Sequence, residues 1–168
     1  MKQKGKWIAG TTLCLLLVAF VTSVYLLQPV KDVPELSLQA IDGQTINLAG
    51  LKGVPTLVTF WATSCSTCMQ EMPHLIDLYH ELNADGFEII AIAMAYDPPN
   101  RVVQLARDRS LPYPVILDIK GNAARAFGDI SVTPTSILVG PDGKILKTLK
   151  GKIDFESLRQ QIRQMQFA

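Results

Sequence analysis

This chain has few cysteines, few histidines and a net charge close to zero. Only 3 of its 168 residues are cysteine, 2 are histidine, and the formal net charge is +1. So few cysteines exclude a small domain stapled by several disulfides. A near-neutral charge, with no basic patch interleaved with aromatic residues, gives no electrostatic basis for binding nucleic acid. Internal repeats and low-complexity stretches are also absent from the sequence. The composition therefore favours one globular domain with an additional segment.

The additional segment is a long uncharged run near the N-terminus. Lys2, Lys4 and Lys6 precede residues 7–27, which carry no charge. A helix of that length rises about 31 Å, which is enough to cross the hydrocarbon core of a bilayer. The three lysines before the run outnumber the single Lys31 soon after it. This asymmetry favours a cytoplasmic N-terminus.

These features divide the chain into a basic cytoplasmic tail (1–6), one transmembrane anchor (7–27), a linker (28–34) and a folded domain (35–168). The domain would then lie on the periplasmic or extracytoplasmic side of the cell membrane, where disulfide chemistry is permitted. A cleaved signal peptide is the alternative. The apolar run exceeds the roughly 7–15 residues usual for one, and only a weak cleavage site exists at 21–23, so an uncleaved anchor is favoured. Cys14 within it is expected to be a small apolar residue.

The other two cysteines, Cys65 and Cys68, are separated by two residues. They follow the apolar, β-rich segment 55–60 and precede residues 69–83, whose pattern predicts a helix. A thiol at a helix N-terminus is favoured as thiolate by unpaired backbone N–H groups and by the helix dipole. A second cysteine one turn further on can close a disulfide with little backbone movement. The pair is therefore typical of a dithiol/disulfide couple.

The rest of the domain alternates strands and helices. Strands are expected over residues 36–40, 45–48, 54–61, 87–95, 114–117, 135–139 and 144–149, and helices over 69–83, 100–110, 122–127 and 155–165. Turn sequences at 41–44 and 140–143 predict two hairpins. Asp97 and Asp154 are expected to cap the helices that follow them. This order predicts an α/β fold with a mixed central sheet, an N-terminal β-hairpin and helices on both faces.

Three stretches of sequence carry a family resemblance. They are VTFWAT at 58–63, CMQEMP at 68–73, and VTPTSIL at 132–138 followed by Asp142 and Gly143. With them, the chain from about Val33 onward, together with the anchor layout, resembles the membrane-anchored thioredoxin-like reductases of the TlpA/ResA group. That group includes the cytochrome c maturation thioredoxins. The resemblance implies a thioredoxin-like fold, preceded by one transmembrane helix, and a thiol:disulfide oxidoreductase activity.

The resemblance also implies roles for individual residues. Cys65 would be the attacking nucleophile and Cys68 the resolving thiol. Glu71 would lie near the dithiol, raise the thiol pKa values and assist proton transfer. Without the resemblance, the alternative for Glu71 is an ordinary solvated helix residue.

A client protein would bind on the side formed by Trp61, Thr133 and Pro134. The resemblance implies that Thr133–Pro134 is a cis peptide beside the dithiol, where it presents backbone groups to the client chain. Pro73 would kink the helix that carries the cysteines.

Three positions depart from the thioredoxin pattern. Thr59 stands where thioredoxin has a buried acid, so proton handling cannot follow the thioredoxin route and Glu71 becomes the better candidate. Ser64 stands where a second tryptophan is usual. Between the cysteines, Ser66 and Thr67 include no proline, which leaves the turn less restrained and the reduction potential open.

The expected protein is a monomeric, membrane-anchored thiol:disulfide oxidoreductase with no bound cofactor and no metal. The resemblance implies reduction of disulfides in client proteins, during cytochrome c maturation or copper-oxidase assembly. A membrane electron-donor thiol reductase would recharge it.

Other chemical uses of the two cysteines are the alternatives to this one. A Cu(I) metallochaperone would use Cys65 and Cys68 as soft ligands, together with Met69 or His74. One cysteine pair supplies too few ligands for structural zinc. A peroxidase would need serine or threonine in place of Ala62. A purely structural disulfide would close too short a loop to stabilise the fold much.

Overall fold

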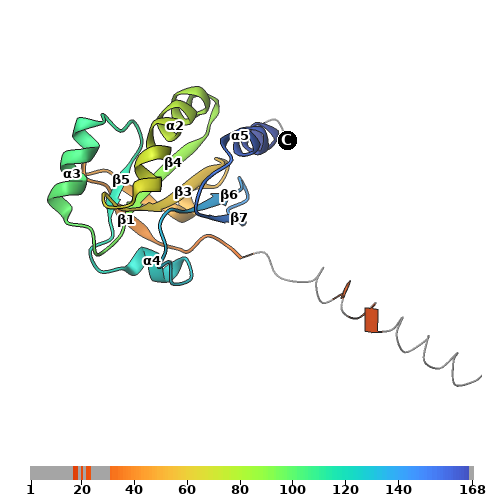
Figure 1. Ribbon diagram of the computed structural model, residues 1–168. Coiled ribbons are helices and arrows are strands. Elements are labelled where there is room, and N and C mark those ends of the chain that lie inside the picture. The colour runs from red at the N-terminus through yellow and green to blue at the C-terminus, as the bar shows by residue number, and fades with distance from the viewer. Residues whose placement is uncertain (1–16, 19, 21, 24–30, 167–168) are drawn as a thin grey trace, which may run out of the picture. The chain divides into compact units, whose positions relative to one another are not determined.

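The computed structural model describes residues 17–18, 20, 22–23 and 31–166 (Figure 1). The expected tail, most of the expected anchor with Cys14, and the start of the linker lie outside these residues. Among the residues that are described, no helix has both the length and the apolar character needed to cross a membrane. The compact domain begins at Lys31.

A five-stranded mixed sheet forms the centre of this domain (Figure 1). Its order is β5 (Val115–Leu117), β4 (Glu88–Ala93), β3 (Thr56–Trp61), β6 (Thr135–Val139) and β7 (Ile145–Lys150). β3 pairs in parallel with β4 and antiparallel with β6. Every residue of β3 is buried, and four of its six residues are apolar, as expected of a strand covered on both faces. The expected mixed sheet is confirmed.

Helices cover both faces of the sheet (Figure 1). On one face, α2 (Ser66–Leu82), α3 (Pro99–Asp108) and α5 (Phe155–Gln166) share a hydrophobic core with the sheet. α4 (Asn122–Ala126) packs on the other face, together with the hairpin of β1 (Ser37–Gln39) and β2 (Thr45–Asn47). Two short 3-10 helices, Leu48–Leu51 and Asn83–Asp85, complete the elements. The two-sided arrangement agrees with the sequence prediction.

The N-terminal hairpin forms as expected and lies beside the β5 edge of the sheet. β1 and β2 pair antiparallel around a turn in which Gly43 has a φ of 90°, a conformation that glycine adopts without strain. The chain after β1 runs alongside β5, where the Ile41 N–H donates to the Val115 carbonyl at 2.9 Å. The hairpin therefore covers part of the edge that β5 would otherwise expose.

The last residues of the expected linker belong to the fold. The Ile145 N–H donates to the Lys31 carbonyl at 2.8 Å, and the Val33 N–H donates to the Gly143 carbonyl at 2.9 Å. Val33 is also buried in the core on the α4 side of the sheet. The folded domain thus begins at Lys31, where an apolar side chain and two backbone hydrogen bonds fix the incoming chain beside the turn between β6 and β7.

Two helix starts differ from the expected ones. α2 begins at Ser66 with Cys65 as its N-cap, so both cysteines belong to the helix start. α3 begins at Pro99 with Pro98 at the N-cap position and receives no side-chain cap. The prediction that Asp97 caps this helix is therefore wrong, because its carboxylate bonds to a different segment. The predicted cap at Asp154 is confirmed, since its Oδ1 accepts the Ser157 N–H at 3.1 Å.

Candidate active site

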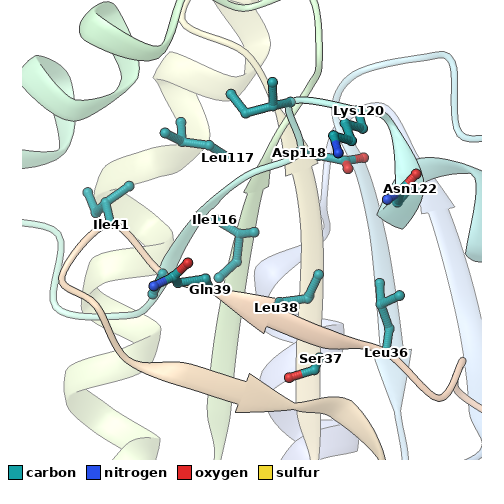
Figure 2. Close-up of a pocket in the computed structure, with 12 residues that line it drawn as sticks. Leu36, Ser37, Leu38, Gln39, Ile41, Ile116, Leu117, Asp118, Lys120 and Asn122 are labelled. Carbon is teal, nitrogen blue, oxygen red and sulfur yellow. The ribbon is translucent and has the colours of Figure 1, made fainter.

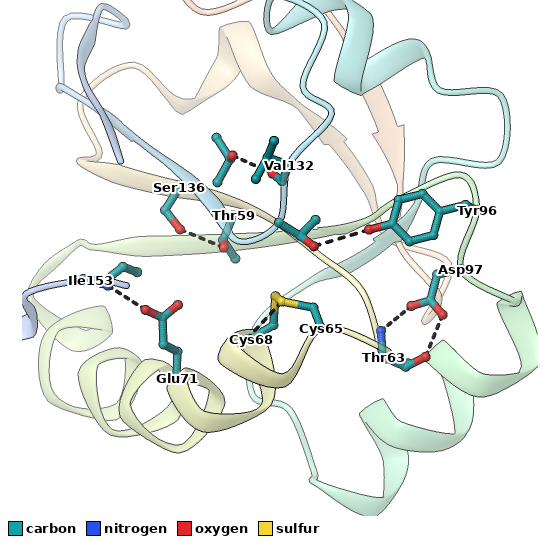
Figure 3. The surroundings of a disulfide bond; sticks show 12 residues. Thr59, Thr63, Cys65, Cys68, Glu71, Tyr96, Asp97, Val132, Ser136 and Ile153 are labelled. Atoms are coloured by element: carbon teal, nitrogen blue, oxygen red, sulfur yellow. Dashed lines mark hydrogen bonds between the residues drawn. A yellow bond between two sulfur atoms is a disulfide. The ribbon is translucent and has the colours of Figure 1, made fainter. Parts of the chain in front are cut away.

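Cys65 and Cys68 are joined in a disulfide at the N-terminus of α2 (Figure 3). The Cys65 Sγ accepts the Cys68 N–H at 3.1 Å, and the Cys65 carbonyl accepts the Met69 N–H at 3.1 Å. Cys68 is only 5% exposed, whereas Cys65 is half-buried. The more accessible sulfur is therefore the one on the helix cap, where free N–H groups and the helix dipole favour a thiolate.

Glu71 lies one helical turn after Cys68 and points inward (Figure 3). It is 3% exposed, so it is not a solvated surface residue. Its Oε1 accepts the Ile153 N–H at 2.6 Å, which ties α2 to the segment between β7 and α5. Burial raises the pKa of Glu71 above its usual value, while the Ile153 N–H and the charges of Lys152 and His74 act in the opposite direction.

A narrow cavity brings Cys68 and Glu71 together. It is lined by Thr59, Trp61, Cys68, Glu71, Met72, Leu75, Ala91, Leu111, Tyr113 and Pro134. The space inside amounts to about 10 Å³, roughly what one water molecule needs. Burial raises the pKa of Tyr113 far above its usual range, so this phenol keeps its proton. Glu71 is therefore the carboxyl group lining this cavity, with a pKa raised by burial, beside the sulfur of Cys68.

Thr59 occupies the inner side of the same cavity. Its hydroxyl and the Ser136 hydroxyl, both buried, are hydrogen-bonded at 2.9 Å. The pair joins β3 to β6 at the register position where these two residues face each other. Thr59 therefore has a neutral partner, and Glu71 supplies the carboxyl group of this cavity.

The residues expected to bind a client lie around the disulfide at different depths. The Thr133–Pro134 peptide is cis, as the resemblance implies, and Pro134 is buried in the lining of the cavity that holds Cys68. The Thr133 hydroxyl and the exposed Tyr96 hydroxyl are 3.3 Å apart. Trp61 also lines the cavity, and at 4% exposure it offers little surface to another protein.

Asp97 is a site residue for which sequence reasoning gave the wrong role. It is 5% exposed, and its two carboxylate oxygens accept the N–H and the hydroxyl of Thr63, both at 2.6 Å (Figure 3). Thr63 lies between the end of β3 and Cys65. The two residues are 34 positions apart in the chain. Parallel pairing of Trp61 with Ala93 places the segments that follow β3 and β4 side by side, and only this pairing could have indicated the contact.

A wider hollow lies away from the disulfide, beside β1 and β5 (Figure 2). It has a volume of about 450 Å³ and includes Asp118 and Lys120 on the segment between β5 and α4, and Asn122 at the start of α4. The Asp118 carboxylate accepts the N–H groups of Ala123 and Ala124, at 3.1 and 2.9 Å. None of the predicted site residues lines this hollow.

Two of the candidate metal ligands, Cys65 and Cys68, are joined to each other in the disulfide. Within the described part of the chain, no group of three or more histidine, cysteine, aspartate or glutamate side chains is placed to hold a metal ion. The His74 ring packs against Phe155, with ring centroids 5.2 Å apart.

Comparisons with known proteins agree with this geometry. A model of the AhpC/TSA family matches residues 29–148. The thiol-disulfide oxidoreductase ResA of Bacillus thuringiensis subsp. konkukian is 31% identical over 135 residues, which cover 80% of this chain and 77% of that protein. ResA of Geobacillus thermodenitrificans is 26% identical over 171 residues, covering 96% and 97%. The crystal structure of StoA from Bacillus subtilis superposes with a TM-score of 0.65 at 27% identity, covering 74% of this chain and 93% of StoA.

Proposed function

We propose that this chain reduces disulfides in client proteins outside the cytoplasm. It belongs to the AhpC/TSA family and is a thiol-disulfide oxidoreductase of the ResA and StoA type. Its domain has the thioredoxin-like fold of that group. The observation that carries the proposal is the Cys65–Cys68 disulfide at the start of α2, with the accessible sulfur on the cap and a buried acid, Glu71, on the same cavity as the inner sulfur.

The reaction begins from the reduced form. The Cys65 thiolate attacks one sulfur of a client disulfide, so that bond breaks and a Cys65–client mixed disulfide forms. The departing client thiolate takes up a proton. Cys68 then loses its proton and attacks the Cys65 Sγ, which breaks the mixed disulfide and releases the second client thiolate. Two electrons have passed to the client, and the protein is left with the Cys65–Cys68 disulfide.

Glu71 accepts the proton that Cys68 must lose in the second step. Both residues line the same cavity, and burial raises the pKa of the Glu71 carboxyl toward the working range of a general base. When ionised, the same carboxylate opposes a second negative charge on the nearby thiols and so raises their pKa values. Reduced thiolates are stabilised less in such a site, which favours donation of electrons over their acceptance.

The outward location rests on the sequence of the first thirty residues. The uncharged run at 7–27, preceded by three lysines, supports a single membrane span with the folded domain on the far side. There the client disulfides would be those of apocytochrome c or of proteins that assemble the copper site of an oxidase. Each turnover leaves the protein oxidised, so an external dithiol, supplied by a membrane thiol reductase, must restore Cys65 and Cys68.

The proposal is tested by a Cys68→Ser variant. This variant keeps the attacking sulfur but cannot release the client, so mixed disulfides with envelope proteins should accumulate and be identifiable by mass spectrometry. A Cys65→Ser variant is the matched control, and it should trap nothing. If the Cys68→Ser protein forms no adduct through Cys65, the oxidoreductase mechanism is wrong.

The direction of electron flow has its own measurement. Equilibration of the Cys65–Cys68 pair with glutathione, or with a stronger reducing couple, gives the reduction potential. A potential well below that of the envelope supports a reductase. A potential at the strongly oxidising end of the range would make the protein a disulfide donor and contradict the proposed direction.

A further inference from the structure

We propose that Asp97 is a positioning residue for the attacking sulfur, and that it acts by clamping Thr63, two residues before Cys65. The proposal rests on the oxidoreductase function above, because its effect is measured on that reaction. Asp97 belongs to the segment between β4 and α3, outside the helix that carries the cysteines.

The clamp consists of two short hydrogen bonds from one carboxylate to one residue. Asp97 Oδ2 accepts the Thr63 N–H and Oδ1 accepts the Thr63 hydroxyl, each at 2.6 Å. Two charge-assisted bonds to the same residue fix its orientation as well as its position. Asp97 is itself held, because it is 5% exposed and its own N–H donates to the Met94 carbonyl at 2.9 Å. The segment between β4 and α3 thus holds the main chain of the neighbouring β3–α2 junction.

The clamped residue lies in the short turn that presents the nucleophile. β3 ends at Trp61 and α2 begins at Ser66, with Cys65 as its N-cap. Within this turn, the Cys65 N–H also donates to the Ala62 carbonyl at 3.1 Å. Between the cysteines, Ser66 and Thr67 provide no proline to restrain the chain. Hydrogen bonds to the residues before Cys65 therefore contribute more to holding Cys65 in place. Attack on a disulfide needs the sulfur in a defined orientation, and small misplacements of a reacting group slow a reaction strongly.

Asp97 is free to make this contact because its local partners are missing. The next two residues are Pro98 and Pro99, which have no N–H to donate, and α3 receives no side-chain cap. Asp118 provides the contrast. It directly follows β5 and is 7% exposed, but its oxygens accept N–H groups of α4, the next helix in the chain. Asp118 therefore serves as the matched control for a buried acid with a local role.

Three variants of the full-length protein separate position from charge. Asp97→Asn removes the charge but keeps both bonds, since its carbonyl can accept the Thr63 N–H and its amide can donate to the Thr63 oxygen. Asp97→Ala removes the charge and both bonds. Thr63→Val removes only the hydroxyl bond and keeps the charge. The measured quantities are the rate at which the reduced protein attacks glutathione disulfide, and the pH midpoint of that rate, which reports the Cys65 thiol.

We expect Asp97→Ala to react about tenfold more slowly than Asp97→Asn, with a pH midpoint higher than that of Asp97→Asn. Both variants lack the carboxylate, so the difference between their rates and pH midpoints reports the two hydrogen bonds to Thr63 that position Cys65. Thr63→Val should lose about threefold in rate relative to wild type, the effect of one hydrogen bond. Asp118→Ala should lower the unfolding midpoint and leave both the rate and the pH profile of the folded protein unchanged.

The role of Asp97 is excluded if Asp97→Ala and Asp97→Asn share one rate and one pH midpoint, or if Asp118→Ala slows attack as much as Asp97→Ala. Should Asp97→Ala not fold, a wild-type rate in Thr63→Val is sufficient to exclude it. These outcomes are distinct from failure of the proposed function. If the proposed function fails, the wild-type protein itself does not react with glutathione disulfide through Cys65.

Discussion

Two strand-to-helix junctions of this domain are built alike but used differently. β3 leads into α2 and β5 leads into α4, both from the carboxyl ends of parallel strands. Each junction is held by a buried aspartate whose two oxygens each accept a hydrogen bond. At the β5–α4 junction the aspartate is Asp118, and its donors belong to the helix directly after it. At the β3–α2 junction the aspartate is Asp97, which belongs to a different junction altogether.

The difference separates stability from chemistry. A local cap such as Asp118 satisfies N–H groups that would otherwise be unpaired, and its benefit is to the helix itself. Asp97 leaves α3 without a side-chain cap and fixes the turn that carries a reactive sulfur instead. Residues near the β5–α4 junction should therefore affect folding alone, whereas those near the disulfide should alter thiol chemistry.

The largest effect on stability, with none on thiol chemistry, is expected for Phe127→Ala. Phe127 ends α4 and packs edge-on against Phe60 of β3, with ring centroids 5.5 Å apart. Loss of this buried ring should lower the free energy of unfolding by about 3–5 kcal/mol, measured by denaturant titration. The reduction potential should stay at the wild-type value, even though Phe60 is on the strand that leads to the disulfide.

Phe127→Leu is the control for the aromatic contact, because it retains most of the buried volume and should destabilise the protein less. A shift in potential that follows the loss of stability through both variants would contradict the separation. It would mean that packing on the α4 side of the sheet reaches the redox turn.

A smaller effect, but one that depends on pH, is expected for Glu71→Gln. Burial raises the pKa of Glu71 in the folded protein above its ordinary value of 4.5. The folded state therefore binds more protons than the unfolded state as the pH rises from about 4.5, and the wild type loses stability through that range. Glutamine still accepts the Ile153 N–H and does not ionise. The variant should gain stability over wild type at pH 7 and show no such gain at pH 4.

The same variant should lower the pKa of the thiols, because it removes a negative charge from their cavity. Asp77→Asn is the matched control: Asp77 is exposed on the same helix, so its loss should change neither quantity. An unchanged thiol titration in Glu71→Gln would remove Glu71 from the redox site and leave its carboxyl as a structural tie to Ile153.

The smallest effect is expected at the far end of α2. Arg163 of α5 pairs with Glu81 at 2.6 Å, and Glu81 also binds Arg159 at 2.9 Å. Arg163→Ala should cost less than about 1 kcal/mol of unfolding free energy, because the pair is solvent-exposed and Glu81 keeps a second partner. The cost should shrink further in high salt. A change in the pKa of the Cys65 or Cys68 thiol in Arg163→Ala would show that the far end of α2 affects the thiols at its start.

The features that the sequence predicted correctly depend on neighbours in the chain. β6 at 135–139 follows from an apolar, β-branched run that ends at a turn sequence. The Asp154 cap needs a donor only three residues away. The redox pair is recognisable because an apolar strand, two cysteines and a helix follow one another directly. Local pattern is sufficient for each of these.

What the sequence left hidden depends on contacts between distant segments. Asp97 before two prolines has the pattern of a helix cap, yet its partner Thr63 is 34 residues away. Glu71 can be placed near Cys68 by helical spacing, but its partner Ile153 is 82 residues away and gives no local signal. Likewise, the pairing of Lys31 with Ile145 converts an expected linker into part of the fold. Only the assembled sheet brings these groups together.

The pairing of the incoming chain with the turn between β6 and β7 has a mechanical consequence. Any tension that arrives through residue 30 is received first by the backbone bonds of Lys31 and Val33, at the β7 edge of the sheet. β6 lies between that edge and β3, the strand that ends beside the disulfide. A pull on the chain at Lys31 would therefore load this edge of the sheet before it loads the turn at Cys65.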